Sequence, residues 1–181
     1  MFSQTNIRLV LDDHDAVLHL NDSFDIAEFV VEDLEFKPLG PAYYDLDLTY
    51  TGDGVLALGV VTLDVSAPCV RCLEEFPLRI NSEVQTLFYL DPTVDDAGDP
   101  LPFIDDEGNI SLLDELYEDL RMETPFAPLH DRDCLGLCPK CGVNLNVETC
   151  TCSHEIDPTH PLAGLIGLIG EDGHADEEDS E

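Results

Sequence analysis

Seven cysteines are the residues of this chain whose types and spacing could do chemistry. Six of them form three close pairs and one stands alone: Cys69-x-x-Cys72, Cys138-x-x-Cys141, Cys150-x-Cys152 and Cys134. A Cys-x-x-Cys turn places two thiolates on one side, which suits two corners of a Zn²⁺ tetrahedron with Zn–S bonds of about 2.3 Å. Pro139 presets such a turn, and Gly142 lets backbone N–H groups approach the sulfur atoms. The pattern therefore predicts metal binding.

The spacing leaves one or two Zn²⁺ ions open. A zinc ribbon would join the two Cys-x-x-Cys pairs around one ion, with the ligands Cys69, Cys72, Cys138 and Cys141. A two-site scheme gives one ion to Cys138, Cys141, Cys150 and Cys152, and the other to Cys69, Cys72, Cys134 and His130, with His154 as a competing ligand. The shorter loop favours the local site by only about 2 kcal/mol. We prefer two sites because no thiol is then unexplained. Closed four-ligand sites of either kind are structural.

Catalytic chemistry has less support. A thioredoxin-like pair needs Cys-x-x-Cys at the start of a helix that follows a strand, whereas Cys69 and Cys72 lie between two expected strands. A thiol redox enzyme or a zinc-dependent enzyme that uses this pair stays as the alternative. The chain shows neither a nucleophile spaced with its base nor a Gly-rich phosphate loop that contains a lysine. We therefore predict that it is not an enzyme.

The chain is strongly acidic. Its 181 residues include 40 Asp and Glu but only seven Lys and Arg, which gives a formal net charge of −33 at pH 7. Such a surface repels nucleic-acid phosphates and attracts basic proteins, so we expect a basic protein partner. Acidity could also serve solubility alone. Direct RNA binding, a further alternative, would need a local patch of Arg71, Arg79, Arg121 and Arg132.

No targeting segment is expected. Met1 is followed by neither a basic segment nor a long apolar run, and the apolar stretch at 161–169 is too short to span a bilayer. We therefore expect a cytoplasmic protein with no membrane partner. Cysteines in that compartment stay reduced, which favours metal ligation over disulfides.

An antiparallel meander must position the first cysteine pair. Alternating apolar and polar residues predict strands at 44–50, 55–65 and 78–90, with a turn at 51–54 between the first two. Shorter strands are expected at 7–11 and 17–20, a short helix at 23–34 and a loop at 91–106.

One main helix is expected after this loop. Ser111 is a suitable N-cap, and Leu112, Leu116 and Leu120 fall on one face of a helix over 111–123. Pro125 ends it. Residues 130–154 lack apolar periodicity, so we expect them to need a metal to fold.

These elements indicate an α+β fold: an antiparallel β-sheet that could close toward a barrel, one main helix and a small zinc-bound C-terminal lobe. We expect the sheet domain at 1–129 and the cysteine-rich lobe, with a short apolar segment, at 130–169. Residues 170–181 form an acidic tail that we expect to be disordered, because it holds almost no apolar residues.

Taken together, these motifs resemble the YceD family. The resemblance covers about residues 40–169, in order: Cys69-x-Arg71-Cys72-Leu73, Ser111-Leu112-Leu113 with Glu115 and Leu120, Pro125-x-x-Pro128-Leu129-His130, Cys134-x-Gly136-Leu137-Cys138-Pro139-x-Cys141-Gly142-x-x-Leu145-Asn146, Cys150-x-Cys152, and Asp157-Pro158 with Pro161, Leu162 and Leu165. Family members are described as large ribosomal RNA accumulation proteins, needed for normal levels of 23S ribosomal RNA, and no enzymatic activity is established for them.

The resemblance implies both a function and a ligand. Many family members of the cysteine-rich type carry a cysteine at the position of His130, which implies that this position binds metal. Other members lack most of the cysteines, which implies that the metal supports the fold. We therefore expect a non-enzymatic factor for 23S ribosomal RNA accumulation or large-subunit assembly. Its expected partner is a basic ribosomal protein or assembly factor, with only indirect association with 23S ribosomal RNA.

Overall fold

The computed structural model describes residues 4–152. The chain divides into two compact units between Gly136 and Leu137. The predicted apolar segment, the acidic tail and the alternative ligand His154 lie outside the described residues. None of the helices in the described range is long and apolar enough to cross a membrane.

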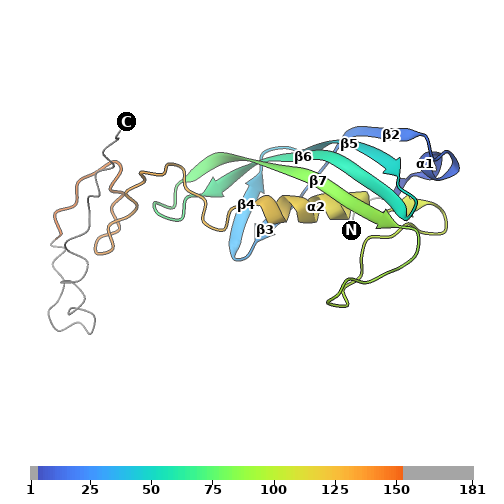
Figure 1. Ribbon diagram of the computed structural model, residues 1–181. Coiled ribbons are helices and arrows are strands. Elements are labelled where there is room, and N and C mark those ends of the chain that lie inside the picture. The colour runs from blue at the N-terminus through green and yellow to red at the C-terminus, as the bar shows by residue number, and fades with distance from the viewer. Residues whose placement is uncertain (1–3, 153–181) are drawn as a thin grey trace, which may run out of the picture. The chain divides into compact units, whose positions relative to one another are not determined.

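The first unit is built around an antiparallel sheet (Figure 1). Its strands are β2 (Val17–Phe24), β3 (Phe29–Val31), β4 (Leu34–Pro38), β5 (Ala42–Tyr50), β6 (Gly54–Pro68) and β7 (Glu75–Tyr89). One edge of β6 pairs first with β5 and then with β4, and its other edge pairs with β7 over its whole length. β2 extends the sheet beyond β5, and β3 extends it beyond β4. The predicted meander at 44–90 is confirmed.

The helix α2 (Leu112–Glu123) packs on the inner face of this sheet, against β6 and β7 (Figure 1). Leu112, Leu116 and Leu120 are fully buried, which confirms the predicted helix and its apolar face. Burial stabilises the fold by about 2 kcal/mol for each such leucine. Ser111 occupies the N-cap position, but its side chain makes no cap hydrogen bond. Thr124 is extended, as expected of a residue that precedes a proline.

Two predicted elements near the N-terminus are wrong. Residues 8–12 form a short helix, α1 (Arg8–Asp12), instead of a strand, because the buried Ile7 and Val10 are three residues apart. The predicted helix at 23–34 is instead the end of β2 and the hairpin of β3 and β4. Phe29 and Val31 are buried and Val30 is exposed, which is the alternation of a strand.

The sheet does not close into a barrel, so that part of the predicted fold is also wrong. Within the described residues, β2 pairs with β5 and β7 pairs with β6, and β2 and β7 do not pair with each other. In a closed barrel, strands from the opposite side would cover the inner face of the sheet. Here the leucines of α2 cover it instead. A two-stranded sheet of β1 (Thr5–Asn6) and β8 (Asn109–Ile110) completes the unit.

Close backbone packing between β5 and β6 depends on one glycine. A Cβ atom on Gly59 would lie 2.0 Å from the backbone oxygen of Asp45 and 2.9 Å from the Cα of Leu46. Both are backbone atoms of the paired strand, which cannot rotate away. Gly59 is therefore required for the register that joins the central strand to β5.

Candidate metal centres

The first candidate centre lies at one end of the long hairpin of β6 and β7. Cys69 and Cys72 occupy the connection between these strands, and His130 and Cys134 come from the segment after α2. One possible ligand atom from each residue lies within 4.8 Å of the other three. The Sγ atoms of Cys69 and Cys134 are 3.8 Å apart, and Nδ1 of His130 is 3.4 Å from Sγ of Cys72. We call this group the hairpin site.

Tight turns and an arginine hold the hairpin site together. The backbone N–H of Leu73 donates to the carbonyl of Cys69 at 2.8 Å and closes the turn of the pair. Nη1 of Arg71 donates to the carbonyls of Arg132 and Cys134, at 3.0 and 2.9 Å. Arg71 thereby fixes the segment that supplies Cys134. This role could not be predicted from the sequence, because it depends on a contact across more than sixty positions of the chain.

Gly136 allows the segment that supplies Cys134 to lie close to the backbone of Arg71. Its φ of +73° is disfavoured for other residues, and a Cβ atom there would lie 3.0 Å from the backbone oxygen of Arg71. The backbone N–H of Val70 also donates to the carbonyl of Pro128, at 3.0 Å. Backbone contacts thus join both segments that supply ligands.

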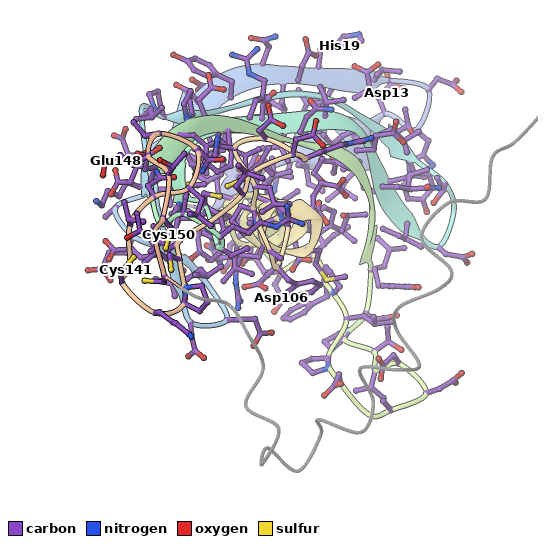
Figure 2. All side chains as sticks on the ribbon, turned by 90° about the vertical axis from the view of Figure 1, so that its left-hand side faces the viewer. Asp13, His19, Asp106, Cys141, Glu148 and Cys150 are labelled. Carbon is purple, nitrogen blue, oxygen red and sulfur yellow. The ribbon has the colours of Figure 1, made fainter. Side chains whose placement is uncertain are left out.

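The second candidate centre is local to the second unit. It comprises Cys138, Cys141, Cys150 and Cys152, whose Sγ atoms all lie within 4.8 Å of one another. Sγ of Cys150 is 3.3 Å from that of Cys138 and 3.7 Å from that of Cys141. Figure 2 shows the Cys141 and Cys150 side chains together on this segment. We call this group the four-cysteine site.

Backbone hydrogen bonds shape the turn of the four-cysteine site. The N–H of Gly142 donates to the carbonyl of Cys138, and the N–H of Cys138 donates to the carbonyl of Val143, both at 2.8 Å. Gly142 has a φ of +72°, which glycine adopts readily. The N–H of Lys140 points to Sγ of Cys138 at 3.4 Å, and that of Cys152 points to Sγ of Cys150 at 3.2 Å. Such N–H groups stabilise thiolates, the form that binds metal.

The second unit has almost no apolar core in its described part. Between residues 137 and 152 only Cys138 is buried. Hydrophobic burial therefore cannot hold this segment in one conformation, and metal coordination is the available substitute.

The distances fit a tetrahedral ion. A tetrahedron with Zn–S bonds of about 2.3 Å has sulfur–sulfur edges of about 3.8 Å. The three sulfur–sulfur distances given above, 3.3–3.8 Å, lie close to this value. They are far longer than a disulfide bond of about 2.05 Å, and all seven cysteines are free. Both groups could hold a metal ion.

The thiol pKa values bear on how each group could bind a cation. Burial raises the pKa of Cys69, but backbone N–H groups of Cys72 and His130 outweigh it and lower the pKa to about 5. The N–H of Glu74 favours the Cys72 thiolate, yet burial and the neighbouring thiols raise its pKa to about 11. Crowded thiolates repel one another, and a bound divalent cation would offset this repulsion when they ionise together.

The same opposition appears in the four-cysteine site. Backbone N–H groups of Cys141 and Lys140 lower the pKa of Cys138 to about 6. The N–H of Cys152 favours the Cys150 thiolate, but the neighbouring Cys138 and burial raise its pKa to about 12. Each group therefore combines a thiol of lowered pKa with a neighbour whose pKa is raised.

The structure brings the eight predicted ligands into two groups of four, as the two-site scheme requires. The alternative ribbon would take two ligands from each unit, whereas each of the two observed groups lies within one unit. Two other histidines, His14 and His19, lie outside both groups. His14 stacks on Tyr50, and His19 projects from β2 and contacts Asp47 (Figure 2).

Comparison with known proteins gives relatives but no solved structure, since none matches this chain. An uncharacterised protein of Mycobacterium tuberculosis is 34% identical over 134 residues, which cover 71% of this chain and 63% of that protein. A second, from Mycobacterium leprae, is 33% identical over 121 residues, or 65% of this chain and 55% of that protein. The chain therefore spans less than two thirds of the length of these relatives.

A plant relative carries a descriptive name. The protein of Zea mays named large ribosomal RNA subunit accumulation protein YCED homolog 1, chloroplastic, is 28% identical over 161 residues, or 72% of this chain and 55% of that protein. The sequence model of the family described as large ribosomal RNA subunit accumulation protein YceD matches residues 58–168. This range contains all eight predicted ligands. The chain belongs to the YceD family.

Proposed function

We propose that this protein is a non-enzymatic cytoplasmic factor that supports 23S ribosomal RNA accumulation or large-subunit assembly by binding a basic protein partner. The observation that carries the proposal is the family match over residues 58–168, together with the family's description. The net charge of −33 supports a basic partner, because opposite charge steers association and keeps it reversible.

Both candidate centres are proposed to hold structural Zn²⁺. Zn²⁺ prefers four such donors: either four thiolates or three thiolates and one imidazole. Four protein ligands leave no open position for water or substrate, which supports a structural role over a catalytic one. Native and denaturing mass spectrometry of the purified protein should differ by two zinc ions. A difference of one ion, or none, contradicts this assignment.

Three of the four arginines of the possible basic patch already have partners, which favours a protein partner over direct RNA contact. Of the arginines that a basic patch would use, Arg79 pairs with Asp64 and Arg121 pairs with Glu118. Arg71 donates to two backbone carbonyls of the hairpin site. Cations already engaged in this way add little attraction for phosphate. Filter binding of a 23S fragment across a salt series should therefore show no salt-dependent affinity.

One observation favours the rival thiol chemistry, which is the pKa of about 5 for Cys69. Cys69 is fully buried, however, and a reactive cysteine must be accessible. Iodoacetamide labelling of the zinc-loaded native protein should therefore show no fast-reacting cysteine. Rapid, selective labelling of Cys69 or Cys72 would support the redox alternative instead.

A pull-down from lysate at low and high salt tests the proposed partner. The tagged, zinc-loaded chain should recover a basic ribosomal protein or assembly factor at low salt and lose it at high salt, since ionic attraction is screened. Cells that lack the protein should show reduced 23S ribosomal RNA, restored by the wild-type gene. Recovery of neither kind of protein at low salt counts against the proposal.

A further inference from the structure

The face of the sheet turned away from α2 carries an exposed apolar stripe. Alternate residues of β6 point to this outer face, where Leu58 and Val60 remain 42% and 39% exposed. Leu39 and Tyr43, at 60% and 61% exposure, continue the stripe. Single exposed apolar residues are ordinary, but neighbouring ones on one face form a surface suited to a partner.

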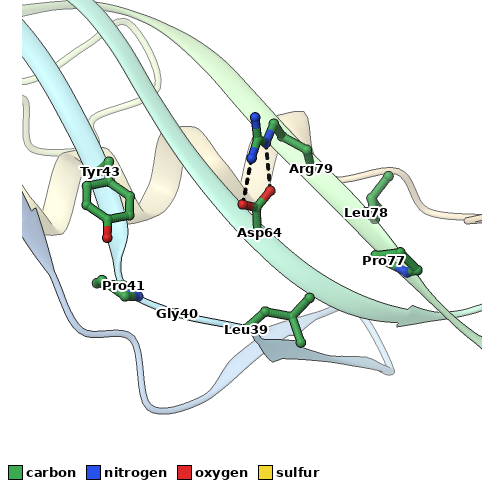
Figure 3. Close-up of a pocket in the computed structure, with 8 residues that line it drawn as sticks. All are labelled: Leu39, Gly40, Pro41, Tyr43, Asp64, Pro77, Leu78 and Arg79. Atoms are coloured by element: carbon green, nitrogen blue, oxygen red, sulfur yellow. Dashed lines mark hydrogen bonds and ion pairs between the residues drawn. The ribbon is translucent and has the colours of Figure 1, made fainter.

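Two open hollows lie on this face. The first, of about 450 Å³, is lined by Leu58, Gly59, Val60, Glu83, Val84 and Gln85. The second, of about 630 Å³, is lined by Leu39, Gly40, Pro41, Tyr43, Asp64, Pro77, Leu78 and Arg79 (Figure 3). The second hollow forms where β5 and β4 part along β6, since the pairing with β5 ends at Thr62 and that with β4 begins at Val65. Side chains of a partner could enter both hollows.

Carboxylates border the stripe on both sides. Asp45 of β5 and Glu83 of β7 are the cross-strand partners of Val60. Asp47 of β5 is the cross-strand partner of Leu58. Directly opposed residues share a face of the sheet, with Cβ atoms about 4.5–5.5 Å apart. The three carboxylates therefore lie directly beside the apolar side chains, and we call them the flanking acids.

The lysine and arginine on this face are engaged with other acids. Nε and Nη2 of Arg79 donate to the two carboxylate oxygens of Asp64, at 2.7 and 2.8 Å. Nζ of Lys37 donates to Glu75. These pairs balance the charge of Asp64 and Glu75. Among the flanking acids, Asp47 contacts His19 and Asp45 accepts a hydrogen bond from Nδ2 of Asn21 at 2.8 Å. Within the described residues, none of the three pairs with a lysine or an arginine. The stripe therefore lies in a negative potential, which attracts positively charged side chains.

We propose that this outer face is the docking surface for a segment of the partner that is rich in Lys and Arg and has apolar residues between them. Its apolar side chains would cover Leu58 and Val60, and its cations would pair with the flanking acids. Charge complementarity selects this occupant over nucleic acid, whose phosphates the same carboxylates repel. The inference rests on the proposed function, because it names the surface that the basic partner uses.

A peptide titration tests the surface directly. The zinc-loaded full chain, labelled with ¹⁵N, is titrated with a synthetic peptide of alternating Lys and Leu, and with one of alternating Glu and Leu as control. The amide shifts caused by the Lys peptide should concentrate at 43–47, 58–62 and 81–85, and the Glu peptide should cause none. Shifts concentrated elsewhere, or equal shifts with both peptides, overturn the proposal.

Matched charge variants separate this surface from net charge. The triple variant Asp45→Asn, Asp47→Asn, Glu83→Gln should weaken binding of the Lys peptide by about tenfold at low salt. The control triple Asp91→Asn, Asp96→Asn, Glu107→Gln changes the net charge equally in an exposed loop and should weaken it by less than twofold. Equal losses in both triples mean nonspecific attraction and overturn the proposal. Broadening of the 58–62 signals with protein concentration alone would assign the face to a second copy instead.

The lysate pull-down distinguishes the two proposals when it is repeated with both triples. Loss of the basic partner in the flanking-acid triple only supports the surface. Equal recovery by all three proteins overturns the surface and leaves the proposed function standing. If the wild type binds the Lys peptide at this face but captures no ribosomal protein or assembly factor, the proposed function fails and the surface stands.

Discussion

Arg71 is the side chain that fixes the last ligand segment of the hairpin site. It carries no metal-binding atom, yet it donates to two carbonyls beside Cys134. Arg71→Met should therefore lower the zinc affinity of this site by about tenfold or more, as loss of supporting contacts does at other metal sites. Competition with a chromogenic chelator measures the change. Arg79→Met, the same replacement on the outer face, should leave the affinity unchanged, and equal losses would remove the special role of Arg71.

His130 should be replaceable by cysteine but not by alanine. Its Nδ1 atom lies 3.4 Å from Sγ of Cys72, and a thiolate is an equally suitable zinc ligand. Native mass spectrometry should find two zinc ions in His130→Cys and fewer in His130→Ala. His19→Ala, which removes a surface imidazole, should keep both ions. Two tightly held ions in His130→Ala would exclude His130 as a ligand.

At this scale the sequence indicates candidate ligands but not what orients them. Seven cysteines and one histidine supply the eight ligands that two tetrahedral ions need. The structure places these residues in two groups of four. Arg71 and Gly136 could not be predicted, since their contact joins distant parts of the chain. From the sequence, Arg71 belongs to the Cys69-x-Arg71-Cys72-Leu73 motif and to a possible RNA-binding patch, and neither indicates that it orients ligands.

The helix α2 stabilises the first unit through its buried face. Leu116 is fully buried, so Leu116→Ala should lower the free energy of unfolding by about 3 kcal/mol through lost burial and a cavity. Met122, on the same helix, is 85% exposed, and Met122→Ala should change it by less than about 0.5 kcal/mol. Urea denaturation of the zinc-loaded protein gives both values. Similar values for the two variants would mean that α2 does not pack as described.

Gly59 tests the join between β5 and β6. An added methyl group would collide with the backbone of Asp45 and Leu46, so Gly59→Ala should cost about 2 kcal/mol or more. Gly40→Ala is the control, because nothing lies within 4 Å of a Cβ atom there. The same denaturation experiment compares them. A Gly59→Ala variant as stable as Gly40→Ala would show that β5 can shift at little cost.

Elements with a long, regular apolar period were predictable, and short ones were not. The three central strands and α2 each repeat their period several times, so single exceptions do not obscure it. The β3 and β4 hairpin has only three and five residues in its strands, and its turn at Glu32 has a φ of +53°, which the residue type does not signal. Sheet closure depends on long-range pairing, which local patterns do not contain.

Across the whole molecule, the two units should respond differently to loss of metal. Chelation should collapse the amide signals of residues 137–152, where only Cys138 is buried, and leave those of the central strands dispersed. Cys138→Ser should reproduce the collapse, and added Zn²⁺ should restore the wild type alone. A metal-free protein with ordered residues 137–152 would contradict the structural role of the ion.

The sequence gives the net charge of the molecule but not how that charge is distributed over its surface. The net charge of −33 is evident from composition. Composition does not show which carboxylates pair with a lysine or an arginine and which do not. Only the register shows that Asp45 and Glu83 stand on either side of Val60, while Asp64 is engaged by Arg79. The proposed docking surface therefore depends on the strand pairing of the sheet, which the sequence alone does not give.

The hairpin site also has a consequence for biosynthesis. Cys69 and Cys72 leave the ribosome well before His130 and Cys134, and about 60 residues at 5–20 residues per second take roughly 3–12 s to make. Throughout that interval the nascent chain contains only Cys69 and Cys72 of the four possible ligands of the hairpin site. Any soft cation or oxidant that meets it then competes with correct assembly, so metal supply during translation becomes a determinant of yield.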